Sequence, residues 1–180
     1  SEAGTRILTD PYTPTASLTH GRLKEPVDVV TISHEHGDHN YIGMASGQPI
    51  AVRGPGEFVV SGISFHGTPT FHDSSNGSQR GRNTVFTFTV DEVKVCHLGD
   101  LGHVLNQDQA AGIGSVDVLL APVGGYFTIG PDEAWKVANQ LAAKIVIPMH
   151  FKTAKVNFPI VSVEEFLKGK PNVIRLDSST

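Results

Sequence analysis

Cysteine is almost missing from this chain, which has Cys96 alone among 180 residues. A single thiol excludes an internal disulfide and is typical of proteins that work in a reducing compartment. The first residues are polar and lack the apolar stretch of a secretory signal. We therefore expect a cytoplasmic protein.

Long apolar runs and dense basic segments are also missing. No run approaches the roughly 20 apolar residues that a membrane-spanning helix needs, so we expect no membrane partner. The chain has 14 Lys and Arg against 18 Asp and Glu, a formal net charge of −4 with neutral histidines. No basic cluster offsets this charge, so nucleic-acid binding has little electrostatic support and we expect no nucleic-acid partner.

The remaining composition is that of a soluble globular protein. Hydrophobic residues make up 39% of the chain and charged residues 18%, which is close to the average for folded domains. A chain of this length can bury a substantial core, and we see no linker or internal repeat. We therefore predict a single domain spanning residues 1–180.

Histidine is the residue type that stands out, with nine copies. Three of them share a six-residue segment with an aspartate, and the segment directly follows the apolar run 27–33. That run is rich in β-branched residues, which predicts a buried strand. The segment at its exit is His34-Glu35-His36-Gly37-Asp38-His39.

The spacing within this segment suits two metal ions. Side chains alternate along a strand, so His34 and His36 point to one side. Gly37 permits a turn that brings Asp38 and His39 back toward the same space. Imidazole nitrogens and carboxylate oxygens are ordinary ligands for zinc and its neighbours. One ion would take the first pair and a second ion the other pair; the alternative is a solvated polar loop that is rich in histidine by chance.

The same pattern, an apolar strand followed by a metal-type ligand, recurs at His72, Asp100 and His150. Sheets commonly place binding sites where their strands end, so these side chains are expected to converge with the first cluster. Seven ligands suit two metals with one bridging carboxylate and an open position for water. The predicted ligands are His34, His36, Asp38, His39, His72, Asp100 and His150.

Periodicity and turn residues predict the other elements. Segment 84–90 alternates with period two, which predicts one solvated face, and it pairs with 93–98 in a hairpin. Helices are expected from Asn106, from Pro131 and, with a capping box, from Ser162. The remaining expected strands are 5–9, 49–52, 57–60, 63–68, a central strand at 116–123, a buried strand at 144–150 and a terminal strand at 173–176.

Several polar residues outside the ligand set are assigned weaker roles. His20 and His66 are interpreted as exposed surface residues. His97 lies inside a strand, as a supporting group for a ligand or as a satisfied core histidine. His103 follows Asp100 closely, and we predict that it contacts the substrate as a catalytic residue beside Asp38. Substrate contacts are also considered for Arg80, Arg82 and Tyr126, because a guanidinium suits carboxylate and phosphate groups.

The motif His-x-His-x-Asp-His after a strand, followed by distant His, Asp and His, resembles the metallo-β-lactamase superfamily. The resemblance covers nearly the whole chain. It implies an α+β or α/β fold, a four-layer αβ/βα sandwich of two mixed sheets with outer helices. It also implies that Asp38 orients the nucleophilic water and that Asp100 bridges the two metals. The first site would be His34, His36 and His72, and the second Asp38, His39 and His150.

More narrowly, the chain resembles the small metal-dependent hydrolase branch that includes the L-ascorbate-6-phosphate lactonase. That branch usually has an N-terminal strand with a Gly-His pair before the segment at Arg6, and no such strand is present here. Two explanations stay open: the chain is truncated at this end, or a neighbouring strand edge is exposed. An exposed edge invites pairing with another chain as a homo-oligomer. The motifs shared with the branch are 7–11, 97–100, 122–125 and 147–150.

The ligand set favours a metal-dependent hydrolase. A metal pair would hold a hydroxide that attacks an ester, lactone or phosphoester bond. The first alternative is a non-catalytic metal-binding or sensor paralogue, which the complete ligand set disfavours. The second is a redox member, whose relatives usually have a carboxylate where this chain has histidine, together with a flavin domain. We expect two divalent ions, zinc first, with Mn²⁺ or Fe²⁺ as alternatives. The expected partner is a small-molecule substrate, with an anionic group considered.

Overall fold

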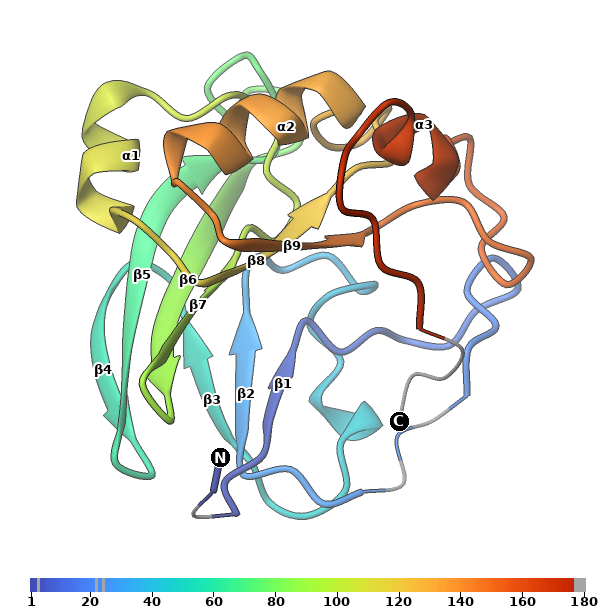
Figure 1. The fold of residues 1–180 in the computed structure, drawn as a ribbon. Coiled ribbons are helices and arrows are strands. Elements are labelled where there is room, and N and C mark those ends of the chain that lie inside the picture. The colour runs from blue at the N-terminus through green and yellow to red at the C-terminus, as the bar shows by residue number, and fades with distance from the viewer. Residues whose placement is uncertain (3, 22, 24, 177–180) are drawn as a thin grey trace.

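The computed structural model describes residues 1–2, 4–21, 23 and 25–176, and its strands form two stacked sheets (Figure 1). The smaller sheet has the order β1-β2-β3, and all its pairs are parallel. The larger sheet runs in sequence order from β4 to β9; it is antiparallel up to β7 and parallel from β7 to β9. The bounds are β1 Ile7–Thr9, β2 Val29–Ile32, β3 Ile50–Arg53, β4 Gly56–Val60, β5 Ile63–Phe71, β6 Arg82–Val90, β7 Val93–His97, β8 Val118–Pro122 and β9 Ile145–Met149.

Strand β5 is longer than its sequence indicates, because it continues through Pro69 to Phe71. Proline lacks the N–H that a central strand needs. Here, however, the pairing with β4 ends at Gly67, and only β6 accompanies β5 beyond that point. The extension delivers His72 directly from the end of a nine-residue strand.

Buried side chains between the sheets form one part of the core. Val29 and Val52 of the small sheet pack with Phe65, Phe86 and their neighbours from the large sheet. The prediction of a solvated face for segment 84–90 was wrong. Val85 packs on the opposite side of β6, toward the helices, so both faces of this strand are covered.

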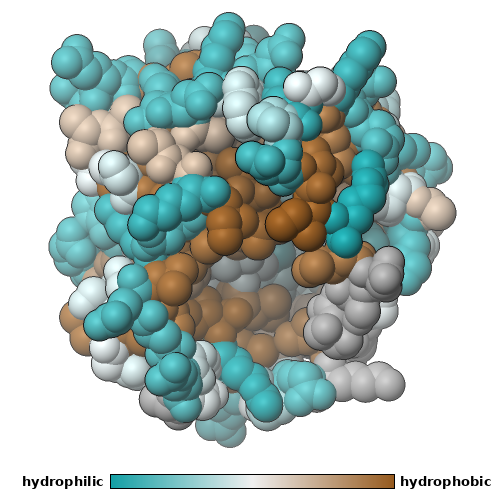
Figure 2. All heavy atoms as spheres, in the orientation of Figure 1, coloured by the Kyte–Doolittle hydropathy of each residue, from teal (hydrophilic) through white to brown (hydrophobic). Residues whose placement is uncertain are grey.

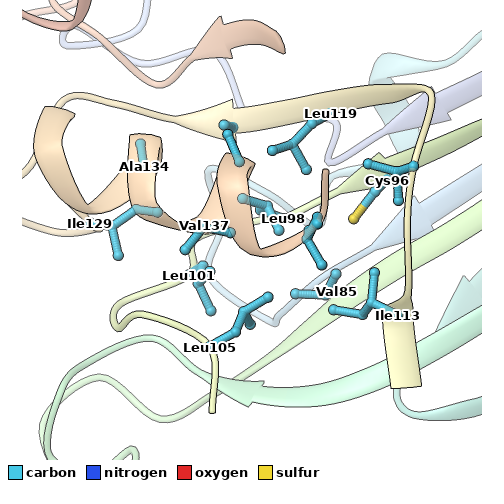
Figure 3. Packing of buried hydrophobic residues seen from close by; sticks show 14 of the residues in the cluster. Val85, Cys96, Leu98, Leu101, Leu105, Ile113, Leu119, Ile129, Ala134 and Val137 are labelled. Carbon is cyan, nitrogen blue, oxygen red and sulfur yellow. The ribbon is translucent and has the colours of Figure 1, made fainter. Parts of the chain in front are cut away.

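Two of the described helices, α1 and α2, cover the outer face of the large sheet, and α3 packs beside α2; their buried side chains form the other part of the core (Figures 1 and 3). Leu98, Leu119 and Val137 are among the side chains buried there. Two predicted helix starts are confirmed: a capping box opens α1 at Asn106, and Pro131 begins α2. The helix at Ser162 forms without a side-chain capping bond, contrary to expectation. The bounds are α1 Gln107–Ile113, α2 Pro131–Gln140 and α3 Val163–Leu167.

The prediction of a four-layer sandwich of two mixed sheets is confirmed only in part. Within the described residues the small sheet is purely parallel, and its outer face is covered by the 3-10 turn η1, Ile42–Met44, and by loop residues rather than by a layer of α-helices. The predicted terminal strand 173–176 is irregular and exposed, because no neighbouring strand pairs with it.

Strands β1 and β9 are edges of their sheets among the described strands. The prediction that 144–150 is a buried strand was therefore wrong: Ile145 is 56% exposed and Ile147 is 47% exposed. Figure 2 shows a hollow ringed by apolar surface on this face, where Figure 1 places β9 above β1. No helix in the described part of the chain has the length and apolar character to cross a bilayer.

Candidate metal centre

Six of the seven predicted ligands come together in two groups, each built at strand ends. His34 and His36 follow β2 and meet His72, which follows β5; their ligand atoms lie within 4.8 Å of one another. A second group of the same size contains His39, Asp100 from the exit of β7 and His150 from the exit of β9.

Asp100 lies between the two groups. Its Oδ2 is 3.2 Å from His72 Nε2, 3.4 Å from His39 Nε2 and 3.5 Å from His150 Nε2. The carboxylate is buried, 3% exposed, so it faces these rings rather than solvent. This is the arrangement that a bridging carboxylate needs.

Asp38 stands at the margin of the second group. Its Oδ2 lies 3.8 Å from His39 Nε2, and its side chain is 36% exposed. It is absent from the tight ligand groups of the described residues, so its role as a ligand stays a prediction. Glu35 turns outward instead and pairs with Arg53 Nη1 at 2.6 Å, which fixes the segment against β3.

Asp10 orients histidines of both groups, and sequence reasoning missed it. Asp10 Oδ2 accepts hydrogen bonds from Ser33 Oγ at 2.5 Å and from His39 Nδ1 at 3.0 Å. Because the Ser33 hydroxyl donates to Asp10, its oxygen accepts from His34 Nδ1 at 2.9 Å. In both rings Nδ1 is therefore the donor to this network, and Nε2 faces the cluster. The strand-exit pattern also applies to Asp10, which follows β1, but it was interpreted as a turn residue.

Asn83 fixes the backbone around Asp100 and was also missed. Its Oδ1 accepts the N–H of Asp100 at 3.0 Å, and its Nδ2 donates to Leu98 O at 2.9 Å and to Thr70 Oγ1 at 2.8 Å. Asn83 is 1% exposed. Its bonds therefore join the ends of β5, β6 and β7, which places Asp100 beside His72.

The position of His150 depends on a close backbone contact. A Cβ at Gly124 would lie 2.1 Å from the carbonyl oxygen of His150, so only glycine fits there. His150 itself has a φ of 52°, a left-handed conformation that turns the chain sharply after β9. A non-glycine residue holds such a conformation only where its surroundings impose it.

The structure does not support the catalytic role predicted for His103. Its Nε2 accepts the N–H of Phe71 at 3.2 Å and its Nδ1 donates to Val104 O at 2.9 Å, so both ring nitrogens are engaged. These two bonds hold the His103 ring against the end of β5, next to His72. His97 is buried, and burial lowers its pKa while the nearby Asp10 acts in the opposite direction; the two roles considered for it stay predictions.

The side chains considered for substrate contact point to different places. Arg80 lies over the ring of Phe127, 5.8 Å from its centroid, and Tyr126 is 65% exposed at the same loop. Arg82 begins β6 opposite Phe71 and is exposed. No hydrogen bond or ion pair ties any of these three side chains to the ligand cluster in the described structure.

The electrostatics of the cluster favour a positive charge at its centre. Burial lowers the pKa of His34 to about 4, and the nearby His39 acts in the same direction. Burial alone would also lower the pKa of His39, but the charge of Asp100 and the hydrogen bond that His39 donates to Asp10 outweigh it and raise the pKa to about 9. Burial raises the pKa of Asp100, whereas His39, His150 and His72 together hold it far below its usual range. His34 is thus neutral, with its lone pair available, beside an ionised carboxylate.

These residues fit divalent metal ions. Among the described residues, His34 Nε2 and Asp100 Oδ1 are buried and have no hydrogen-bond partner. Leaving such groups unpaired costs about 1–3 kcal/mol each, so they point to a bound cation. Neutral imidazole and carboxylate are the donor set that zinc accepts.

A cavity of about 370 Å³ opens beside the second group. Asp38, His39 and His150 are among the residues that line it. His20, interpreted from the sequence as a surface residue, is exposed but also borders this cavity. Its remaining wall is formed by Asp10, Tyr12, Leu18, Pro148, Met149, Phe151, Thr153, Val156, Phe158 and Ile160.

Comparisons with known proteins agree with this geometry. Residues 1–150 match the family model described as a beta-lactamase superfamily domain. A UPF0173 metal-dependent hydrolase of Methanoculleus marisnigri is 34% identical over 92% of this chain and 82% of its own length. The narrower resemblance to the L-ascorbate-6-phosphate lactonase stays a prediction.

Solved structures show the same fold. The crystal structure of a candidate zinc-dependent hydrolase of the metallo-β-lactamase superfamily from Thermotoga maritima is 44% identical, with a TM-score of 0.73 over 90% of this chain and 75% of that chain. Human tRNase Z, short form, has a TM-score of 0.55 at 16% identity over 76% of this chain and 79% of that chain, and shares the fold alone. The chain therefore belongs to the UPF0173 metal-dependent hydrolase family of the metallo-β-lactamase superfamily.

Proposed function

We propose that this protein hydrolyses an ester, lactone or phosphoester bond of a small molecule with two divalent ions, zinc in first place. The observation that carries the proposal is the position of Asp100, whose Oδ2 lies 3.2–3.5 Å from histidines of both ligand groups. A carboxylate removed from water is costly unless opposite charge lies beside it, and Asp100 is placed to receive that charge from an ion in each group.

Each ligand group would hold one ion. His34, His36 and His72 form the first group. His39 and His150 form the second, with Asp38 added at its margin. When bound, a pair of divalent ions polarises the scissile group and supplies a nucleophilic water at neutral pH.

The chain's own residues orient the reactants. Asp10 fixes the rings of His34 and His39 through Ser33 and directly, so both present Nε2 to the centre. Asp38 faces the cavity and is partly exposed, which suits a carboxylate that accepts a hydrogen bond from the attacking water. The cavity beside it gives the substrate its access route.

The test combines metal analysis with turnover. We expect close to two equivalents of divalent metal in protein purified without added metal, and hydrolysis by the zinc-loaded protein of at least one member of a panel of aryl esters, lactones and phosphodiesters. His36→Ala should lower both metal content and activity. Asp38→Ala should lower activity by 10²-fold or more, the usual scale for a positioned general base.

His66→Ala is the matched control, because His66 lies on β5 outside the cluster and pairs with Glu57. It should leave metal content and turnover unchanged. Full metal loading without turnover of any substrate class would favour the sensor alternative, and a protein that binds no divalent metal would refute both.

A further inference from the structure

The cavity beside the second ligand group is walled by apolar side chains. Away from the ligands its surface comes from Leu18, Met149, Phe151, Val156, Phe158 and their neighbours. Several of these are half-buried, so they present apolar surface to the cavity rather than filling a closed core. A volume of about 370 Å³ is within the range of small-molecule sites.

The described wall offers little to an anion. None of the described lining residues is Lys or Arg. Its two carboxylates are Asp38, next to His39 of the second ligand group, and Asp10, which is already engaged with Ser33 and His39. Among the described side chains away from the ligand groups, a phosphate or carboxylate buried against this wall would face the His20 ring and the Thr153 hydroxyl but no lysine or arginine to neutralise it, which is costly.

The wall is built before any ligand arrives. Backbone hydrogen bonds join the segment around Leu18 to the segment around Val156: Thr19 N donates to Lys155 O at 3.0 Å and Asn157 N donates to Ser17 O at 2.9 Å. The Tyr12 hydroxyl donates to His20 O at 2.6 Å, so it holds the wall rather than awaiting a ligand. A preformed apolar site binds without first ordering its own chain.

We propose that this cavity receives the apolar acyl or alkyl part of an uncharged ester or lactone, with the scissile carbonyl at the end formed by Asp38, His39 and His150. The inference rests on the proposed hydrolase function and narrows its substrate class. It replaces the expectation of an anionic group. Leu18 and Val156 become residues that determine chain-length preference.

The first test measures kcat/KM of the zinc-loaded protein for p-nitrophenyl acetate, butyrate, hexanoate and octanoate. Burial of one methylene favours binding by roughly fourfold. We therefore expect kcat/KM to rise about threefold to fourfold per methylene until the cavity is full. p-Nitrophenyl phosphate should be the poorer substrate at every concentration.

Two variants examine the wall. Leu18→Gln places an amide in the cavity and should flatten the chain-length series. Val156→Thr is nearly isosteric and should flatten the series more weakly; it serves as the test if Leu18→Gln folds poorly. Leu23→Gln is the matched control, because Leu23 is 42% exposed and does not line the cavity. A steep series that survives in both wall variants would overturn the proposal.

A binding measurement separates this inference from the proposed function. 1-Hexanol titrated into the protein should shift the amide NMR signals of Leu18 and Val156, and Leu18→Gln should weaken its affinity about tenfold or more. Turnover of p-nitrophenyl acetate with a flat series and no hexanol binding would leave the hydrolase standing and refute the apolar subsite. Hexanol binding without turnover of any ester would support an apolar binding site and refute ester hydrolysis.

Discussion

Asn83→Ala is the substitution whose consequence follows most directly from the structure. The Asn83 side chain makes three buried hydrogen bonds, to Asp100 N, Leu98 O and Thr70 Oγ1. The Thr70 hydroxyl keeps its own bond to the backbone carbonyl of Asn83. The variant therefore leaves two buried backbone groups, the N–H of Asp100 and the carbonyl of Leu98, without partners.

Each of these groups costs about 1–3 kcal/mol when unpaired, so we expect a loss of roughly 2–6 kcal/mol. This is a large share of the roughly 5–15 kcal/mol that stabilises a typical domain. Urea unfolding of the metal-free protein measures the loss. Asn139→Ala, on the exposed side of α2, should stay within about 0.5 kcal/mol of the parent. A loss for Asn83→Ala below about 1 kcal/mol with an unchanged m-value would refute the reasoning.

Three further outcomes follow from the same geometry. Asp10→Asn removes the charge that fixes His39 and should weaken zinc affinity by roughly 10–100-fold in a chelator competition, with equal affinity counting against it. Gly102→Ala should lower Tm, because its Cβ would lie 2.3 Å from the backbone at Asp73, whereas Gly112→Ala meets open space in α1 and should add about 0.5–1 kcal/mol; the opposite order would show the contacts to be misplaced. Burial raises the pKa of Asp73, but four backbone N–H donors outweigh it and hold the pKa at about 2. Since this lies below the unfolded value of about 3.9, the stabilisation is complete above pH ~4 and is lost toward pH ~2, and Asp73→Asn should flatten thermal stability over that window.

The ligand cluster could be predicted from the sequence because each member stands at a local boundary. His34 follows β2, His72 follows β5 and His150 follows β9, and in each case an apolar run ends where a metal-type side chain begins. Strand exits gather at one edge of a sheet, so local patterns were enough to predict a shared location. Asp10 obeys the same rule after β1, and only its reading as a turn residue hid it.

The exposure of individual strands could not be predicted, because it depends on neighbours that are distant in sequence. Segment 144–150 reads as a buried run, yet β9 is the edge of the large sheet and Ile145 is exposed. Segment 84–90 alternates cleanly, yet helices cover the face of β6 that alternation assigned to solvent. Periodicity reports a side chain's direction, whereas burial depends on what the rest of the chain places there.

His103 and Asn83 show the same limit at the level of single residues. His103 was favoured because it follows Asp100 closely, but its ring nitrogens bond to Phe71 and Val104. Asn83 reads as a residue between a loop and a strand, but its amide joins three strand ends. Proximity in sequence is a poor guide to which polar group supports a ligand, because such support runs across strands.

The cavity beside the second ligand group is the part of the candidate site that local patterns are least able to predict. Its wall is held together by hydrogen bonds from Thr19 to the backbone carbonyl of Lys155, 136 positions along the chain. Any residue at position 155 would supply that carbonyl. No residue type marks such a contact, so the sequence carries no local sign that Leu18 and Val156 share a surface. Metal ligands are restricted to a few residue types, whereas an apolar wall can be built from many. The metal ligands of this chain can therefore be predicted from its sequence, whereas the residues that would set substrate preference cannot. The chain-length series for Leu18→Gln tests the apolar wall, which only the folded structure reveals.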